Sequence, residues 1–223
     1  MDADPADMMN IDVVSDVVCP WCFVGKRRLE AALSQTGESP VAVRWRPFQL
    51  DPTIPPQGLE RRAYMRAKFR DDARLAEAHA RLRALGAEVG IDFDFEAITR
   101  SPNTLDAHRL IRWASASGVQ DEVVERLFSA YFEHGRDIGD RSVLTEIAAR
   151  CGMDADALER QFADDGDIEA VRAEIAEAQA LGVTGVPFFI FASRFAVSGA
   201  QSAEVLAKAM ESARSGGGRV EVA

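Results

Sequence analysis

Apolar and polar positions in the amino-terminal part of the chain follow three patterns in turn. Residues 10–18, "NIDVVSDVV", form a short β-branched run that predicts a buried strand. From residue 20 to about residue 33 the apolar positions are spaced as in a helix, with a Pro in the first turn. Residues 41–48, "VAVRWRPF", then alternate between two different faces, which predicts a second strand.

A long block of helical patterns occupies the middle of the chain, from about residue 59 to residue 181. It follows a Pro-rich linker, "QLDPTIPPQG". Ser101 is expected to cap one of its helices, with Pro102 at the first helical position. Several segments end at a Gly, as helices commonly do. The predicted helical segments are 63–90, 101–118, 121–135, 142–152 and 167–182.

Strand patterns return near the carboxyl end. "PFFIF" and "RFAVSG" are short apolar or aromatic runs on either side of a turn, which predicts a β-hairpin before a last helix over 202–214. The order strand, helix, strand, helical block, hairpin, helix predicts an α/β protein with a thioredoxin-like fold. A large all-helical insertion separates its second and third strands. The expected parts are 1–58 and 183–214 for the thioredoxin-like domain, 59–182 for the insertion and 215–223 for a flexible tail.

Composition narrows the class of protein. A chain of 223 residues, 47% hydrophobic, can bury a full core in one domain, with or without a large insertion. A formal charge of -10 argues against a nucleic-acid partner, because such proteins carry a basic face toward phosphates. The start "MDADPADMMNIDVV" lacks the features of a secretory signal, and no apolar run is long enough to span a membrane. We therefore expect a cytoplasmic protein without a membrane partner.

Two of the three cysteines lie three positions apart in "CPWC", between the first predicted strand and the first predicted helix. Residues at this spacing on a helical turn are close enough to form a reversible disulfide. Cys19 would lie at the amino end of the helix, where unpaired N–H groups stabilise a thiolate. We expect Cys19 to be the nucleophile and Cys22 the thiol that resolves a mixed disulfide.

Other interpretations of the cysteines are weaker. A structural zinc site needs four ligands, and the three histidines, His79, His108 and His134, show no metal-binding spacing, so no metal site is expected. The pair could also be two core cysteines that happen to be close in sequence. Cys151 falls on an apolar helix face and is expected to be a small core residue.

Several motifs, taken in order, resemble one family. They are "SDVVCPWCFVGKRRLE", "RPFQLDP", "NTLDAHRL", "AYFEHGRDIGD", "GVTGVPFFIF" and "SGAQ". From about residue 11 to residue 210 the chain resembles the DsbA-like family, which has a thioredoxin fold with a helical insertion, and specifically its FrnE-like branch. The resemblance implies a disulfide oxidoreductase with Cys19 and Cys22 as the redox pair. It also implies that Pro187 is a cis-proline beside the cysteines, which leaves the backbone of Val186 to pair with a substrate.

The motif "SPNTLDAHRL" has two interpretations. His108 lies one helical turn after Thr104, so it could be a partly buried histidine satisfied by that hydroxyl. Alternatively, this helix faces the cysteines, and Asn103 and His108 line the substrate cleft and influence the thiolate. Trp21 is the expected apolar contact for substrates.

Two other sets of polar residues have a structural interpretation. Lys26, Arg27 and Arg28 are expected to form a solvated helix face, with a glutathione carboxylate site as the alternative. His79, one turn after Leu75, is expected to be structural.

Three functions compete. The leading prediction is a thiol–disulfide oxidoreductase that acts on protein or low-molecular-weight thiols and disulfides, without a bound cofactor. The alternative is a glutathione-dependent isomerase or transferase that resembles 2-hydroxychromene-2-carboxylate isomerase, with glutathione as co-substrate. Those relatives typically carry Ser at the position of Cys19, which weighs against this alternative. The third is a binding module or redox-regulated chaperone. A homodimer is compatible with all three.

Overall fold

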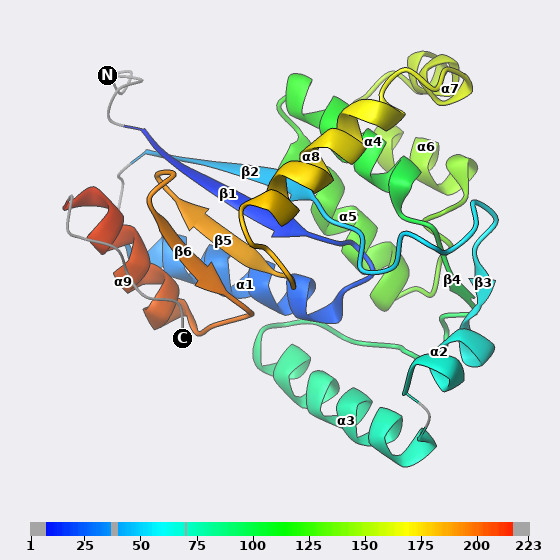
Figure 1. Cartoon of the computed structure of the whole chain (residues 1–223), viewed down its shortest axis with the longest axis horizontal. Helices are drawn as coiled ribbons and strands as arrows, with labels where there is room; N and C mark the ends of the chain where they lie inside the picture. Colours follow the sequence, from blue (N-terminus) through cyan, green and yellow to red (C-terminus); the bar gives the residue numbers. More distant parts are fainter. Residues whose placement is uncertain (1–7, 37–39, 70, 216–223) are drawn as a thin grey trace.

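A four-stranded sheet forms the centre of the molecule (Figure 1). The computed structural model describes residues 8–36, 40–69 and 71–215. The strand order is β2–β1–β5–β6, with β1 parallel to β2 and antiparallel to β5, and β5 antiparallel to β6. The strands are β1 (Met9–Ser15), β2 (Val41–Pro47), β5 (Phe188–Phe191) and β6 (Phe195–Ser198).

The central strand β1 is apolar on both sides because helices cover both faces of the sheet. Ile11 and Val13 are fully buried and Val14 is nearly so. The strand ends at Ser15, earlier than the sequence pattern suggests, because the chain then turns and the Cys19 N–H donates to the carbonyl of Asp16.

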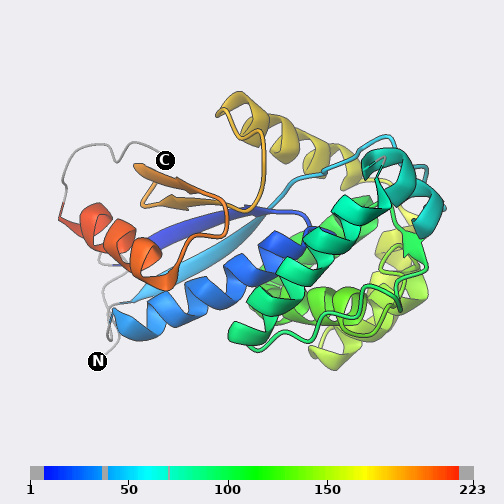
Figure 2. The same cartoon turned by 90° about the horizontal axis from the view of Figure 1, so that it is seen from below.

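Three helices complete this part of the fold. Helices α1 (Pro20–Gln35) and α9 (Ala203–Arg214) lie on one face of the sheet, and α8 (Ile168–Ala180) lies on the other (Figure 2). Val14 and Phe48 pack with Ala178 of α8 beneath that second face. This arrangement of sheet and helices confirms the predicted α/β fold class.

The segment between β2 and β5 is mainly helical, but it also contains a short two-stranded ladder. In this ladder β3 (Leu59–Glu60) pairs antiparallel with β4 (Arg100–Ser101). The expectation of an all-helical insertion therefore needs this correction. The other helices of the segment are α2 (Arg61–Phe69), α3 (Asp72–Glu88), α4 (Leu105–Ala116), α5 (Gln120–Phe132), α6 (Arg141–Arg150) and α7 (Ala155–Ala163).

Two helix boundaries differ from those that the sequence pattern predicts. The predicted helix over 63–90 is two helices, because the Asp71 side chain caps α3 by accepting from the N–H groups of Ala73 and Arg74. Ser101 does not cap α4, since it belongs to β4 and the helix begins at Leu105, after Thr104.

One continuous apolar core joins the sheet to the inserted helices. Phe23 of α1 stacks on Phe128 of α5, with 5.1 Å between ring centroids. Phe93 meets Phe132 edge to face at 5.5 Å and Phe23 at 6.1 Å. Helix α1 thus packs against both the sheet and the inserted helices. The predicted flexible tail, residues 215–223, lies outside the described residues apart from Ser215. None of the helices in the described ranges has the length and apolar character needed to cross a bilayer.

Candidate active site

Cys19 and Cys22 lie at the start of α1, directly after the turn that follows β1. Cys19 is the N-cap residue and has an extended backbone, Pro20 is the first helical residue, and the Cys22 N–H donates to the Cys19 carbonyl at 3.0 Å. Cys19 is 4% exposed and Cys22 is 1% exposed, and both are free thiols. The structure thus places Cys19 at the helix terminus, where an anion is favoured.

The two thiols have unequal surroundings. Burial, together with the neighbouring Cys19 thiol, raises the pKa of Cys22 well above its usual range. Hydrogen bonds involving Ser15 and the backbone of Asp16 oppose this shift. Cys22 is therefore protonated at neutral pH in the resting dithiol. Cys151 is buried at the end of α6, as predicted.

The loop before β5 lies against Cys19 and α1. Its Val186–Pro187 peptide bond is cis, as the family resemblance implies. The Cys19 thiol donates to the Val186 carbonyl at 3.6 Å. A Cβ atom placed on Gly25 would lie only 2.9 Å from Cγ of Pro187, so the helix and the loop are in close contact. Segments 167 positions apart in the chain are thereby joined at the thiol.

A cavity of about 540 Å³ opens beside Cys19. Trp21 and Val186, two of the predicted substrate contacts, line it with Cys19, whereas Pro187 does not. The opposite wall comes from α2, α3 and the linker before them. Most of the lining is apolar or aromatic, including Val18, Leu50, Ile54, Met65, Phe69, Leu75, Leu82 and Phe95. Such a cavity has the volume and character of a small-molecule site.

Asn103 and His108 do not line this cavity. The Asn103 amide donates to the carbonyl of Ile54 at 2.6 Å, and its oxygen accepts from the N–H of Leu105, so it ties the linker to the start of α4. His108 is 2% exposed, and its Nε2 lies 3.4 Å from Oδ1 of the equally buried Asp16. Asp16 does line the cavity, as does Thr104, whose carbonyl accepts from the His108 N–H at 2.9 Å, so His108 contacts residues of the site without lining it.

Several polar side chains of the cavity had no signal in the sequence. Burial and a hydrogen bond to Asp51 raise the pKa of Tyr64 to about 12, and burial raises that of Tyr131 to about 12, so both phenols stay protonated. Arg61 joins them from the first position of α2. These residues lie on helices whose patterns are those of ordinary amphipathic or exposed segments, and only the fold brings them to Cys19.

His79 lies in the cavity wall and also has a structural contact. Its ring stacks on Phe95, with 4.1 Å between centroids. Burial and the nearby Arg61 and Arg83 lower its pKa, so the imidazole is neutral at pH 7. The sequence pattern around His79 indicated the structural contact but not the position in the cavity wall.

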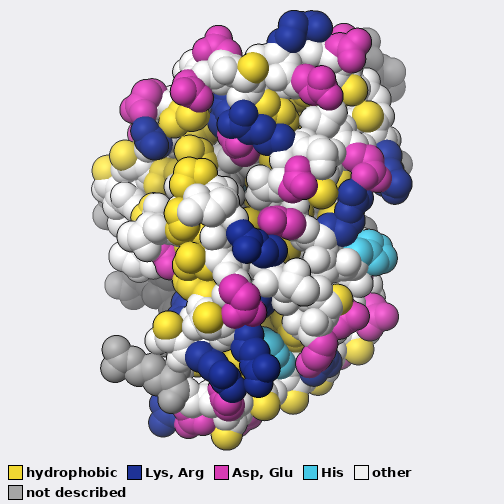
Figure 3. Space-filling model, turned by 90° about the vertical axis from the view of Figure 1, so that its right-hand side faces the viewer, with side chains coloured by type: hydrophobic (Ala, Val, Ile, Leu, Met, Phe, Trp, Pro, Cys, Tyr) yellow, Lys and Arg dark blue, Asp and Glu magenta, His cyan; other side chains and the backbone are white. Residues whose placement is uncertain are grey.

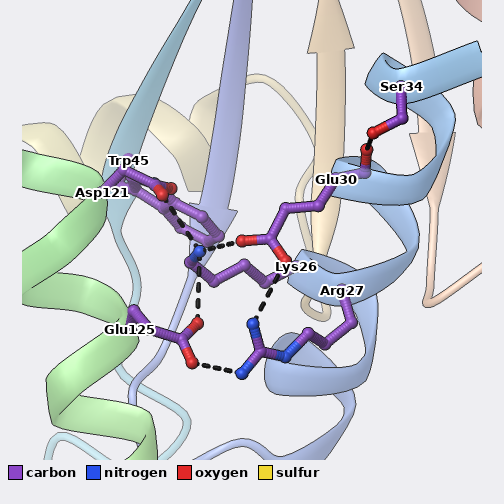
Figure 4. Close-up of polar contacts among 7 residues, drawn as sticks. All are labelled: Lys26, Arg27, Glu30, Ser34, Trp45, Asp121 and Glu125. Atoms are coloured by element: carbon purple, nitrogen blue, oxygen red, sulfur yellow. Dashed lines mark hydrogen bonds and ion pairs between the residues drawn. The ribbon is translucent and has the colours of Figure 1, made fainter. Parts of the chain in front are cut away.

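The basic residues of α1 do not form a solvated face (Figure 4). Lys26 is 2% exposed and forms ion pairs with Glu30, Asp121 and Glu125. Arg27 pairs with Glu30 and Glu125, while Arg28 donates to the carbonyl of Ala200. The prediction was wrong because distant residues come to lie against this helix: carboxylates of α5 against Lys26 and Arg27, and the carbonyl of Ala200 against Arg28. None of these three residues lines the thiol cavity.

In the part of the chain that the structure describes, no group of three His, Cys, Asp or Glu side chains is arranged to hold a metal ion.

Comparisons with known proteins identify a family and a shared fold. The model of the DSBA-like thioredoxin domain family matches residues 10–211. The protein YwbO of Bacillus subtilis is 30% identical over 206 residues, which cover 91% of this chain and 96% of YwbO. The crystal structure of a probable DsbA oxidoreductase from Streptomyces coelicolor is 32% identical, with a TM-score of 0.85, and the match covers 96% of this chain and 94% of that one.

Two more distant structures share the fold. A 2-hydroxychromene-2-carboxylate isomerase has a TM-score of 0.70 at 17% identity, over 91% of this chain and 94% of the isomerase. The cytosolic disulfide reductase DsbM of Pseudomonas aeruginosa, determined with GSH, has a TM-score of 0.61 at 21% identity, over 92% and 96% of the two chains. At these identities the likeness concerns the fold.

Proposed function

Because the chain belongs to the DSBA-like thioredoxin domain family, we propose that it is a thiol–disulfide oxidoreductase with Cys19 and Cys22 as its redox pair. The main support is the position of Cys19, which caps α1 and faces the cavity with Cys22 one turn behind it. Two buried core cysteines would need neither the cavity nor the contact with Val186.

The proposed reaction transfers two electrons. The Cys19 thiolate attacks one sulfur of a substrate disulfide, so that a mixed disulfide forms and the other substrate sulfur leaves as a thiolate. Cys22 then loses its proton and attacks the Cys19 sulfur, which forms the internal disulfide and releases the second substrate thiol. Run backwards, the same steps oxidise a substrate dithiol. Trp21 and the backbone of Val186 are the proposed contacts that hold the substrate next to Cys19.

The partners we propose are protein or low-molecular-weight thiols and disulfides. Glutathione is the first small thiol to test, since the DsbM structure was determined with GSH. No bound cofactor is needed, because the two thiols supply both electrons. The location we propose is the cytoplasm, as the sequence predicts.

Removing each thiol in turn tests this function. Cys19→Ser should abolish disulfide exchange, and Cys22→Ser should stop the reaction at a mixed disulfide that mass spectrometry detects as an adduct on Cys19. Cys151→Ser is the matched control, because Cys151 is also a buried thiol but lies outside the cavity. Undiminished exchange by Cys19→Ser would refute the assignment.

A glutathione-dependent isomerase is the second candidate, favoured by the shared fold of 2-hydroxychromene-2-carboxylate isomerase and by the cavity beside Cys19. It requires glutathione binding that survives Cys22→Ser, and calorimetry without measurable binding would remove it. A redox titration against glutathione separates the two functions. A reversible dithiol–disulfide couple formed by Cys19 and Cys22 supports the oxidoreductase. Its reduction potential, compared with a cytosolic glutathione potential of roughly -220 to -320 mV, gives the direction of electron flow.

A further inference from the structure

The thiol cavity carries more basic than acidic groups, although the whole chain is acidic. The chain has 36 Asp and Glu against 26 Lys and Arg. Basic residues that line the cavity are Arg61, Lys68, Arg74 and Arg81, and the acidic ones are Asp16, Asp51 and Glu77. The charge balance of the cavity is thus the reverse of that of the whole chain. A negatively charged substrate is indicated if the basic groups are not already paired.

Arg61 is the basic residue best placed for a ligand. Its Nη1 donates to the Tyr131 hydroxyl at 3.0 Å, and its guanidinium lies 5.8 Å from the centre of the Tyr131 ring. No carboxylate within the described ranges lies at ion-pair distance from Arg61, in contrast to Arg74, which pairs with Asp71. The rest of the planar guanidinium can therefore receive a carboxylate with two parallel hydrogen bonds.

Two of the three acidic groups of the cavity wall accept hydrogen bonds from the protein itself. Asp16, which is 1% exposed, accepts from the N–H of Leu50 at 2.8 Å through Oδ2, and its Oδ1 lies 3.4 Å from Nε2 of His108. Asp51 accepts from the backbone and hydroxyl of Thr53 and from the hydroxyl of Tyr64. The hydrogen bonds from Thr53 lower the pKa of Asp51, so it stays ionised in this arrangement. These carboxylates are not left to pair with a basic ligand, and Glu77 is exposed.

The remaining wall favours an apolar or aromatic body. Trp21, next to Cys19, lies 5.8 Å from the guanidinium of Arg81, which makes no ion pair with any described residue. Figure 3 views the end of the molecule that carries α2 and shows a band of hydrophobic side chains with basic groups beside it. Leu50 and Phe69 belong to the large hydrophobic residues left exposed, and both also line the cavity.

Cys19 itself is 4% exposed and faces this cavity, so a substrate sulfur must enter the cavity to reach it. We infer that the preferred substrate is a small disulfide with an apolar or aromatic body and a carboxylate, which Arg61 binds while Cys19 attacks the sulfur. The inference rests on the proposed function. The dithiol gives two electrons to one such disulfide, which leaves as two thiols that take up the two protons, and Cys19 and Cys22 become a disulfide.

Two aromatic disulfides that release a coloured thiol test the carboxylate. Reduced protein carrying Cys151→Ser is mixed in single turnover with dithiobis(nitrobenzoate), which has carboxylates, or with uncharged dithiodipyridine. Each rate is divided by that of a small free thiol with the same reagent. The normalised rate should be higher for dithiobis(nitrobenzoate) than for dithiodipyridine. Arg61→Gln should lower the ratio of these two normalised rates roughly tenfold or more, because a charge-assisted pair is lost. Arg61→Lys should restore part of it.

Arg62→Gln is the matched control, since Arg62 is the next residue of the same helix, is exposed and does not line the cavity. Its ratio should equal that of the parent. A ratio that Arg61→Gln leaves unchanged would overturn the role of Arg61, and a faster normalised reaction with oxidised glutathione, whose body is polar, would overturn the apolar preference.

A measurement on the parent protein guards against misfolding of the variants. Naphthoate should slow the alkylation of Cys19 by iodoacetamide more than naphthylmethanol does, and equal protection by both would count against a carboxylate site. If no disulfide forms an internal Cys19–Cys22 bond, the proposed function itself fails. If all of them form it at equal normalised rates, only the substrate inference fails.

Discussion

Gly25 is the residue at which the helix of the redox pair meets the loop of the cis-proline. A Cβ atom there would lie 2.9 Å from Cγ of Pro187 and 3.2 Å from the ring of Phe189. No side chain larger than hydrogen fits without a shift of α1 or of this loop. Since Cys19 contacts Val186 in the same loop, the spacing at Gly25 also determines the geometry of the nucleophile.

Gly25→Ala distinguishes the effect of packing from that of helix propensity, because the two predict changes of opposite sign in the free energy of unfolding. Propensity alone would stabilise the protein by roughly 1 kcal/mol. The close contact predicts instead a loss of about 1–3 kcal/mol in the free energy of unfolding and slower disulfide exchange. Urea denaturation and single-turnover kinetics measure the two effects.

Gly166→Ala is the control for this substitution, since its Cβ would lie 3.6 Å from the nearest atom, in the Asp164 side chain. It should change the stability by no more than about 0.5 kcal/mol. Equal effects of the two substitutions would show that the contact with Pro187 is unimportant.

At the scale of elements, Lys26 connects α1 to α5. Burial alone would lower its pKa, but Asp121, Glu30 and Glu125 raise it, so the ammonium stays charged. Asp121 also accepts from the indole N–H of Trp45 in β2 at 2.9 Å. This network therefore holds three elements together beside the core that carries the redox pair.

Lys26→Met should lower the free energy of unfolding by about 2–4 kcal/mol, because three carboxylates lose their shared cation. The loss should be smaller near pH 5 than near pH 8, since protonation relieves the repulsion among the remaining carboxylates. Thermal unfolding at both pH values measures it.

Arg126→Met provides the comparison for Lys26→Met. Arg126 makes an exposed pair with Glu122 on α5, and its loss should cost at most about 0.5 kcal/mol. A loss for Lys26→Met no greater than this would mean that the network contributes little to stability.

At the scale of the whole molecule, the wall opposite Cys19 is held less firmly than the rest. None of the residues described in α2 is buried, and α3 buries only Leu82 and Gly86. Helix α5, in contrast, buries seven residues and stacks on α1. The cavity thus has one rigid side, which carries the thiols, and one weakly packed side, which carries Arg61.

Amide hydrogen exchange should reveal this difference. Amides of α2 and α3 should exchange through local opening, much faster than those of α5, because few apolar contacts are lost when α2 and α3 open. Exchange followed by mass spectrometry measures both regions in one sample. Equal protection of α2 and α5 would contradict this description.

The sequence by itself determined the order of the four sheet strands and the position of the thiols, but it missed β3, β4 and α7. β-Branched runs, helical spacing and the three-residue separation of Cys19 and Cys22 are local features, and the fold class and the start of α1 follow from them. The motif resemblance added the family, which the comparisons confirm, and the cis bond at Pro187.

Only the tertiary structure decided what surrounds those thiols. Lys26 is buried because Asp121, 95 positions away, comes to lie over it, and no local pattern contains that contact. Asn103 and His108 lie behind the cavity wall, whereas Arg61 and Tyr64 lie in it, because packing between helices determines which face turns toward Cys19. Periodicity gives the face of a helix that is buried, but the charge and shape of a site depend on which distant residues share it.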